Sequence, residues 1–180
     1  GIEIGEYRIV FFTKDYNRFK GFKSAIEKVI YTAEEFIRPS LLTRIGLRYS
    51  NTIEVDKGST LNDYFDDEFK LPLKVGNSGK VAVHKNETQT PTSDGVLLIR
   101  RVTGKTSASI FKDLASMPIV FHETENKLKA FLDIDHSYEA SEDGEFDSNF
   151  VLSKIESLHK TIRSSFWVMT TKFAREEKWK

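Results

Sequence analysis

Apolar residues recur at spacings of three and four along two long stretches of the chain, which is the period of an amphipathic α-helix. The first stretch ends at Arg38, because a residue that precedes proline is pushed out of the α region. The second follows an acidic loop in which Asp147 or Ser148 can cap a helix. The apolar positions are Phe22, Ala25, Ile26, Val29, Ile30, Ala33, Phe36 and Ile37 in the first stretch, and Val151, Leu152, Ile155, Leu158, Ile162, Phe166, Met169 and Phe173 in the second.

Between the predicted helices, apolar and polar residues alternate with the period of two that is typical of a strand with one buried face. The clearest case is residues 44–55, in which Ile45 and Leu47 point one way and Arg44 and Arg48 point the other. The polar segment 86–94, made largely of Thr, Asn, Ser and Pro, predicts an exposed hairpin loop. Further strands are predicted at 7–13, 80–85, 95–102 and 128–138, extended segments at 71–73 and 118–121, and short helices at 61–69 and 110–114.

The order of these elements predicts the fold class. Strands joined by short connections favour an antiparallel sheet, and two amphipathic helices must each bury a stripe against it. We therefore expect one α+β domain spanning residues 1–180, with an antiparallel sheet of about five strands and two long amphipathic helices on one face. A helix-grip arrangement, in which the sheet curls around the last helix, is a close variant.

Charge and composition narrow the classes of function. The chain has 27 basic and 27 acidic side chains, so no overall field attracts nucleic acid or an anionic membrane, and we do not expect this domain alone to bind nucleic acid. The absence of cysteine excludes disulfides, thiolate catalysis and cysteine zinc sites. No apolar run approaches the roughly 20 residues of a membrane span. We expect a cytoplasmic protein.

Motifs of known catalytic chemistry are missing from the sequence. It contains no nucleophile elbow, no phosphate-binding loop and no dinucleotide-binding glycine pattern, and its four histidines show no ligand spacing. His159 lies near the apolar stripe of the last predicted helix, where we interpret it as a packing residue rather than a general base. The sequence therefore leans away from an enzyme and predicts no cofactor.

Asp133 and Asp135 form the best metal-like pair. On a strand, residues two apart share a face, so these two carboxylates are neighbours. Carboxylate oxygens are ligands that Mg²⁺ and Mn²⁺ accept, which makes the pair a candidate metal site. The alternative is that both side chains line the solvated side of a strand.

Arginines on the predicted strands offer a candidate ligand site. Arg44 and Arg48 share the polar face of segment 44–55, and Arg100 is expected nearby. Guanidinium groups bind carboxylates and phosphates through paired hydrogen bonds, so such a cluster can hold an anionic ligand. The alternative is cross-strand pairing with Glu54 or with the Asp133 and Asp135 pair, which would join both clusters into one network on the sheet face.

Two tryptophans near the C-terminus are candidates for binding a partner. Trp167 lies one step from the stripe of the last predicted helix, and Trp179 lies in a charged tail. An exposed tryptophan at a helix end often anchors a protein partner. The alternative is a frayed tail.

Four stretches of the chain resemble an uncharacterised prokaryotic family that is sporadically distributed among bacteria and archaea. They are residues 16–22, 44–51 with the sequence Arg-Ile-Gly-Leu-Arg-Tyr-Ser-Asn, 131–135, and the part of the last helix from Leu158 through Phe166 to Thr170. Members of that family carry a further N-terminal segment, which this chain lacks. The resemblance brings no activity, cofactor or catalytic residue, and it implies a neighbourhood of mobile elements or phage defence.

Three hypotheses of function follow, in this order. The first is a non-catalytic interaction module that acts as a homo-oligomer or as a subunit of an assembly with a protein partner. The second is a metal-dependent hydrolase, perhaps on nucleic acid, that uses Asp133 and Asp135. The third is a small-molecule sensor with a pocket between the sheet and the last helix.

Overall fold

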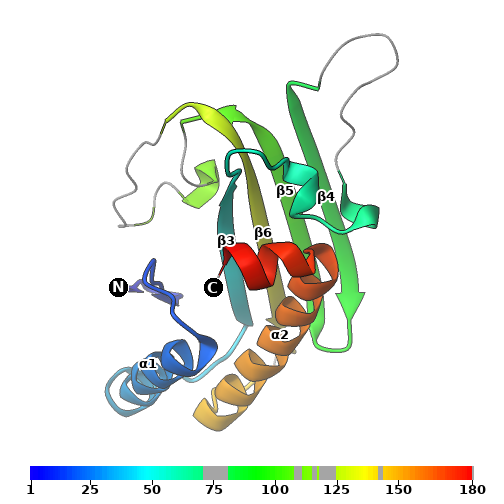
Figure 1. Cartoon of the computed structure of the whole chain (residues 1–180). Helices are drawn as coiled ribbons and strands as arrows, with labels where there is room; N and C mark the ends of the chain where they lie inside the picture. Colours follow the sequence, from blue (N-terminus) through cyan, green and yellow to red (C-terminus); the bar gives the residue numbers. More distant parts are fainter. Residues whose placement is uncertain (71–80, 108–110, 115–116, 118–124, 142–143, 180) are drawn as a thin grey trace.

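A four-stranded antiparallel sheet forms the centre of the molecule in the computed structural model, which describes residues 1–70, 81–107, 111–114, 117, 125–141 and 144–179 (Figure 1). The strand order is β3-β6-β5-β4, and each pair is antiparallel, as the short connections predict. The strands are β3 (Arg44–Glu54), β4 (Val83–Thr92), β5 (Gly95–Thr106) and β6 (Lys127–Glu139). The predicted α+β class with an antiparallel sheet is confirmed.

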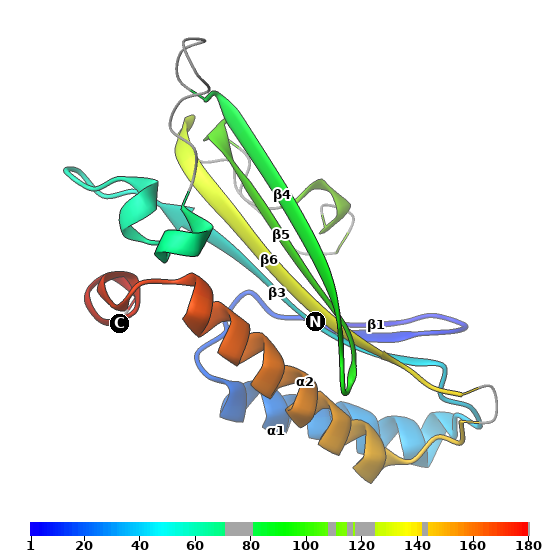
Figure 2. The ribbon, with the colours of Figure 1, turned by 90° about the vertical axis from the view of Figure 1, so that its right-hand side faces the viewer.

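Two long helices pack on the sheet, and both lie on the same side of it (Figure 2). Helix α1 covers Phe19–Thr32 and continues as a π-helical turn over Ala33–Ile37, while α2 covers Ser148–Met169. The carboxylate of Asp147 accepts a hydrogen bond from the Phe150 amide and so caps α2, as one of the two predicted caps. Helix α2 packs against β3 and β6 and fixes the side of the sheet that becomes the core.

The core lies between α2 and the near face of the sheet. Alternate residues of β3 and β6 point into it and meet the apolar stripe of α2, while α1 adds partly buried phenylalanines and isoleucines at its margin. The central members are Leu47, Ile53, Leu132 and Ile134 from the strands, and Ile155, Leu158 and Ile162 from α2. The opposite face of the sheet is therefore left for the polar members of the same alternation.

The segment 86–94 differs from its prediction as a hairpin loop. Residues up to Thr92 belong to β4, and the turn to β5 is only two residues long. Threonine favours strands, and β4 is an edge strand, which tolerates Pro91 and polar side chains on both faces. Gly95 after the turn has φ 138, and a Cβ there would lie 1.9 Å from the Ser137 carbonyl oxygen, so the close approach of β6 requires glycine.

The N-terminal strand also pairs differently from expectation. Residues Ile9–Phe11 form β2, which pairs with β1 (Ile2–Ile4) in a separate hairpin instead of joining the central sheet. The predicted helix at 61–69 is two short 3₁₀ turns, Leu61–Asp63 and Asp67–Phe69. The extended segments predicted at 71–73 and 118–121 lie outside the described residues.

The C-terminal ends of both helices differ from the ends that the apolar patterns predict. The stripe of α1 is predicted to be buried to its end, yet Phe36 is 74% exposed and Ile37 is also exposed. The wide π-helical turn shifts these residues away from the direction of the earlier stripe. Helix α2 stops at Met169 instead of reaching Phe173, because Thr170 leaves the helix in an extended conformation and bridges to Phe65. Within the described residues, no helix is long and apolar enough to cross a membrane.

Candidate functional site

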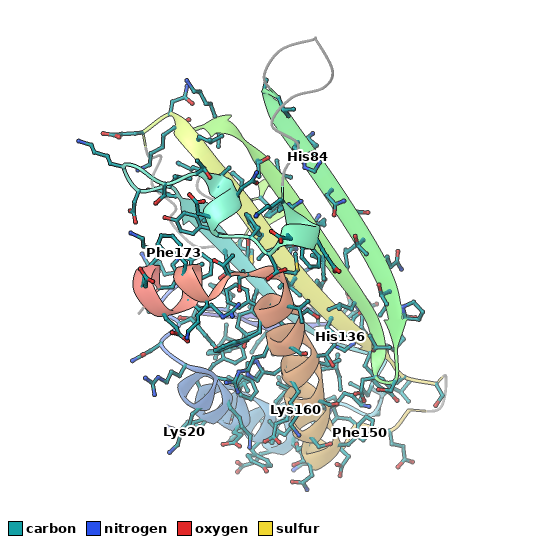
Figure 3. All side chains as sticks on the ribbon, turned by 45° about the vertical axis from the view of Figure 1, so that its right-hand side comes forward. Lys20, His84, His136, Phe150, Lys160 and Phe173 are labelled. Carbon is teal, nitrogen blue, oxygen red and sulfur yellow. The ribbon has the colours of Figure 1, made fainter. Side chains whose placement is uncertain are left out.

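The two faces of β6 carry different chemistry because its side chains alternate. Leu132, Ile134 and His136 point towards α2, and His136 lies within 3.4 Å of the Leu158 carbonyl oxygen through Nδ1 (Figure 3). Asp133 points to the opposite face. Antiparallel pairing sets Arg100 of β5 directly across from it.

Asp133 holds two arginines from the two neighbouring strands. Its side chain is fully buried, its Oδ1 accepts a hydrogen bond from Arg48 Nε at 2.7 Å, and its Oδ2 accepts from Arg100 Nε at 3.0 Å and Nη2 at 2.7 Å. The arginine side chains are less than a quarter exposed. The predicted cross-strand network between the arginine and aspartate clusters is therefore the arrangement that the structure contains.

A second carboxylate, that of Asp113, accepts hydrogen bonds from both arginines. Asp113, on the 3₁₀ turn Lys112–Leu114, accepts hydrogen bonds at its Oδ2 from Arg48 Nη2 at 3.0 Å and Arg100 Nη2 at 2.9 Å. Burial opposes ionisation of Asp113, but the hydrogen bond from Arg100 and the charge of Arg48 outweigh it and lower the pKa of this carboxyl. The sequence offers no signal for this partner, because the segment around Asp113 has no clear period.

An aromatic residue supports the same cluster. The Arg100 guanidinium carbon lies 5.0 Å from the centroid of the Phe111 ring, and this ring meets Phe131 of β6 edge to face at 5.7 Å. A guanidinium over an aromatic face is attracted by the ring quadrupole. Arg100 is thus fixed by Asp133, Asp113 and Phe111 together.

Asp135 and Arg44 lie at the margin of this network. The Arg44 Nη2 is 4.0 Å from Asp135 Oδ2, a long ion pair. Burial raises the pKa of Asp135, and the positive charges of Arg44 and Arg48 only partly oppose this. The carboxylate oxygens of Asp133 both accept from arginine, and the described residues contain no group of three or more acidic or histidine side chains arranged to hold a metal ion.

Tyrosine and histidine side chains from three distant segments meet beside α1. The Tyr49 hydroxyl lies 3.2 Å from the Tyr16 hydroxyl and 3.1 Å from Nδ1 of His159, and the imidazole stacks on Phe19 with ring centroids 3.6 Å apart. Burial raises the pKa of Tyr49, and burial followed by the charge of Arg163 lowers the pKa of His159. His159 thus packs on Phe19 in a setting that favours its neutral form, in line with the prediction of a packing residue.

A cavity of about 160 Å³ lies beside this cluster. Its walls come from β2, α1 and the segment that joins them, including Phe11, Tyr16, Arg18 and Phe22. None of its lining residues belongs to α2 or to the four-stranded sheet. The cavity is therefore not the pocket between the sheet and the last helix that the sensor hypothesis predicts.

Trp167 is exposed near the end of α2. Its residue surface is 47% exposed, and the guanidinium carbons of Arg175 and Arg163 lie 4.5 Å and 5.8 Å from its ring centroid. The Arg175 Nη1 donates to the carbonyl oxygens of Trp167 and Thr170 and to the Thr170 hydroxyl. Arg175 thus satisfies carbonyl groups at the C-terminus of α2 and is held against the indole ring.

Trp179 is neither an exposed anchor nor a frayed tail. It packs on Tyr64 and Phe166 with ring centroids 5.9 Å and 5.6 Å apart, and it is only partly exposed. Phe173, on the short segment after α2, also contacts Tyr64 (Figure 3). The chain folds back after Thr170, which brings this tryptophan to the core margin, while Trp167 stays on the surface.

Comparison of the chain with models of known protein families, with curated proteins and with solved structures found no match. Function must therefore be argued from the described side chains. Two features offer binding chemistry: the pair Arg48 and Arg100 on the far face of the sheet, and Trp167 with its two arginines on α2.

Proposed function

We propose that this chain is a non-catalytic protein-interaction module of the cytoplasm, working as a subunit of an assembly or as a homo-oligomer. Its binding surface comprises Arg163, Trp167, Val168 and Arg175 at the C-terminal end of α2. The observation that carries the proposal is the exposed indole of Trp167 held beside two guanidinium groups.

Tryptophan and arginine are enriched among the few residues that carry most of the binding energy of an interface. An isolated exposed apolar residue needs no explanation, but here the next residue of α2, Val168, is also exposed, at 59%. Hydrogen bonds already fix Arg175, so a partner does not have to order this side chain. A partner that places an apolar side chain on the indole and a carboxylate beside the arginines would match this chemistry.

The resemblance to the sporadically distributed prokaryotic family belongs to the same proposal. An assembly subunit encoded near mobile elements or phage-defence genes would need a protein partner and no catalytic centre of its own. The hydrogen bonds of Asp133 support this proposal over a metal-dependent hydrolase. Both of its carboxylate oxygens accept from arginines, whereas such a hydrolase would need this carboxylate to bind a metal.

Capture of the native protein from its own cells, followed by mass determination of the complex, tests the proposal. We expect a stoichiometric complex, and we expect Trp167→Ala to weaken it by about 30-fold or more in Kd, which corresponds to the roughly 2 kcal/mol of an interface hot spot. Phe36→Ala is the matched control, because Phe36 is an even more exposed aromatic residue at the end of α1.

A strictly monomeric protein without a partner would contradict the proposed function. Loss of the complex with Phe36→Ala and not with Trp167→Ala would move the binding surface to α1. Circular dichroism of both variants must match the unsubstituted protein, so that unfolding is not read as lost binding.

A further inference from the structure

The cluster of Arg48, Arg100 and Asp133 on the far face of the sheet has a formal net charge. Arg48 and Arg100 contribute two positive charges and the buried Asp133 one negative charge, so the three side chains together carry one positive charge. Asp133 fixes both arginines, because it accepts from Nε of each of them. Their orientation is thus set from inside the protein.

The outer atoms of the two guanidinium groups converge on one point. Arg48 Nη2 and Arg100 Nη2 lie 3.0 Å and 2.9 Å from the same oxygen atom, Oδ2 of Asp113. Two like charges repel one another, so a second anion between these outer nitrogen atoms stabilises their approach. We define these two Nη2 groups, held by Asp133, as the arginine fork.

Asp113 is a surface occupant of the fork. Its side chain is 47% exposed, whereas that of Asp133 is fully buried. If Asp113 leaves the fork it returns to water, and an incoming carboxylate restores both the charge balance and the two charge-assisted hydrogen bonds. The exchange of one carboxylate for another therefore keeps the charge balance and the hydrogen bonds of the fork, in contrast to removal of Asp133.

We propose that the arginine fork of Arg48 and Arg100 is a binding site for a carboxylate group, and that Asp113 is its intrachain occupant. The carboxylate comes from a free small molecule or from an acidic side chain of a peptide. This site is independent of the proposed interaction surface, because Trp167 lies on α2, on the opposite side of the sheet.

An intrachain carboxylate competes at an effective concentration on the order of millimolar. A free monocarboxylate therefore enters the fork of the unsubstituted protein only at high concentration. Asp113→Ala removes the competitor and leaves the fork with its positive charge, so we expect the apparent affinity for a carboxylate to rise by about tenfold or more.

Titration of the full chain with acetate, followed by the Nε–Hε resonances of Arg48 and Arg100, tests this site. Asp113→Ala is compared with Asp56→Ala, which also removes an exposed carboxylate from an ion pair but leaves a single lysine, Lys178, and no fork. We expect saturable shifts in Asp113→Ala, weaker ones in the unsubstituted protein, and in Asp56→Ala no gain over the unsubstituted protein.

A hexaglutamate peptide and inorganic phosphate complete the titration. Tighter binding of the peptide than of acetate at equal carboxylate concentration identifies an acidic segment as the source, and equal binding identifies a small carboxylate. Stronger binding of phosphate than of either overturns the assignment to carboxylate. If Asp113→Ala does not fold, Asp113→Asn replaces it, and absence of saturable shifts in a folded variant overturns the proposal.

Discussion

Replacement of Asp133 by asparagine is the sharpest test of the network on the far sheet face. The substitution keeps the size of the side chain but removes the negative charge, and it turns one acceptor into a donor that faces a guanidinium group. Three hydrogen bonds of 2.7, 3.0 and 2.7 Å from Arg48 and Arg100 are then lost or weakened. Both arginines then stay close together with Asp113 as the one carboxylate that binds them both.

The magnitude follows from burial. Removing one partner of a buried ion pair costs about 3–5 kcal/mol, since the remaining charge is left without compensation. The arginines are 24% and 22% exposed and keep Asp113, so water and this carboxylate recover part of the loss. We therefore expect the lower end, about 3 kcal/mol, which is a large share of the roughly 5–15 kcal/mol that holds a domain folded.

Urea unfolding of both proteins, followed by circular dichroism and tryptophan fluorescence, measures this difference. A loss of about 3 kcal/mol lowers the midpoint by about 1–3 M urea for the slopes typical of small domains. The matched control replaces the whole triad by Arg48→Met, Arg100→Met and Asp133→Leu, which removes every buried charge of the set and is expected to recover most of the stability. A loss below about 1 kcal/mol for Asp133→Asn would refute the assignment of this residue as the buried anchor.

Two further predictions concern pH. The lowered pKa of His159 means that the folded state favours the neutral ring. The contribution of His159 to the free energy of unfolding is therefore full above the unfolded pKa of about 6.5 and is lost as pH falls below it. Urea unfolding from pH 7.5 to 5.5 should show this loss, and His159→Gln should remove it. The raised pKa of Asp135 has the opposite effect on stability: ionisation of this carboxyl lowers the free energy of unfolding as pH rises above about 4. Asp135→Asn should therefore give a more favourable change in the urea midpoint at pH 7 than at pH 3. A pH slope unchanged in either variant would contradict the corresponding prediction.

Local periodicity was sufficient to predict the elements that form the core. The three-and-four spacing from Val151 onward places Leu158 and Ile162 in the core, and the alternation in β3 places Ile45 and Leu47 beside them. The same alternation puts Asp133 on the polar face, because period two leaves only two directions for a side chain. Such predictions need only neighbours in the sequence.

Other features depend on contacts between distant residues and left no local signal. Asp113 is 65 residues from Arg48, and only the fold of the turn Lys112–Leu114 against the sheet brings them within hydrogen-bonding distance. Trp179 looks like part of a charged tail because its partners, Tyr64 and Phe166, come from two other segments. Strand β4 has no alternation of apolar and polar residues after Val83, so the signal for this strand is its pairing with β5 and not a hydrophobic pattern.

The network of Arg48, Arg100 and Asp133 on the far face favours one pairing register of the sheet. A slip of one residue in the pairing of a strand turns every side chain to the other face. For β6 such a slip would carry the Asp133 carboxylate into the apolar layer under α2 and would bring Leu132 or Ile134 to the arginines. Burial of an unpaired carboxylate costs several kcal/mol. The slipped register would therefore be unfavourable twice, because Asp133 would be buried without a partner and the two arginines would lose their carboxylate. The network thus favours one alignment of β3, β6 and β5, while the proposed partner surface around Trp167 lies on α2, where we expect substitutions to leave that alignment intact.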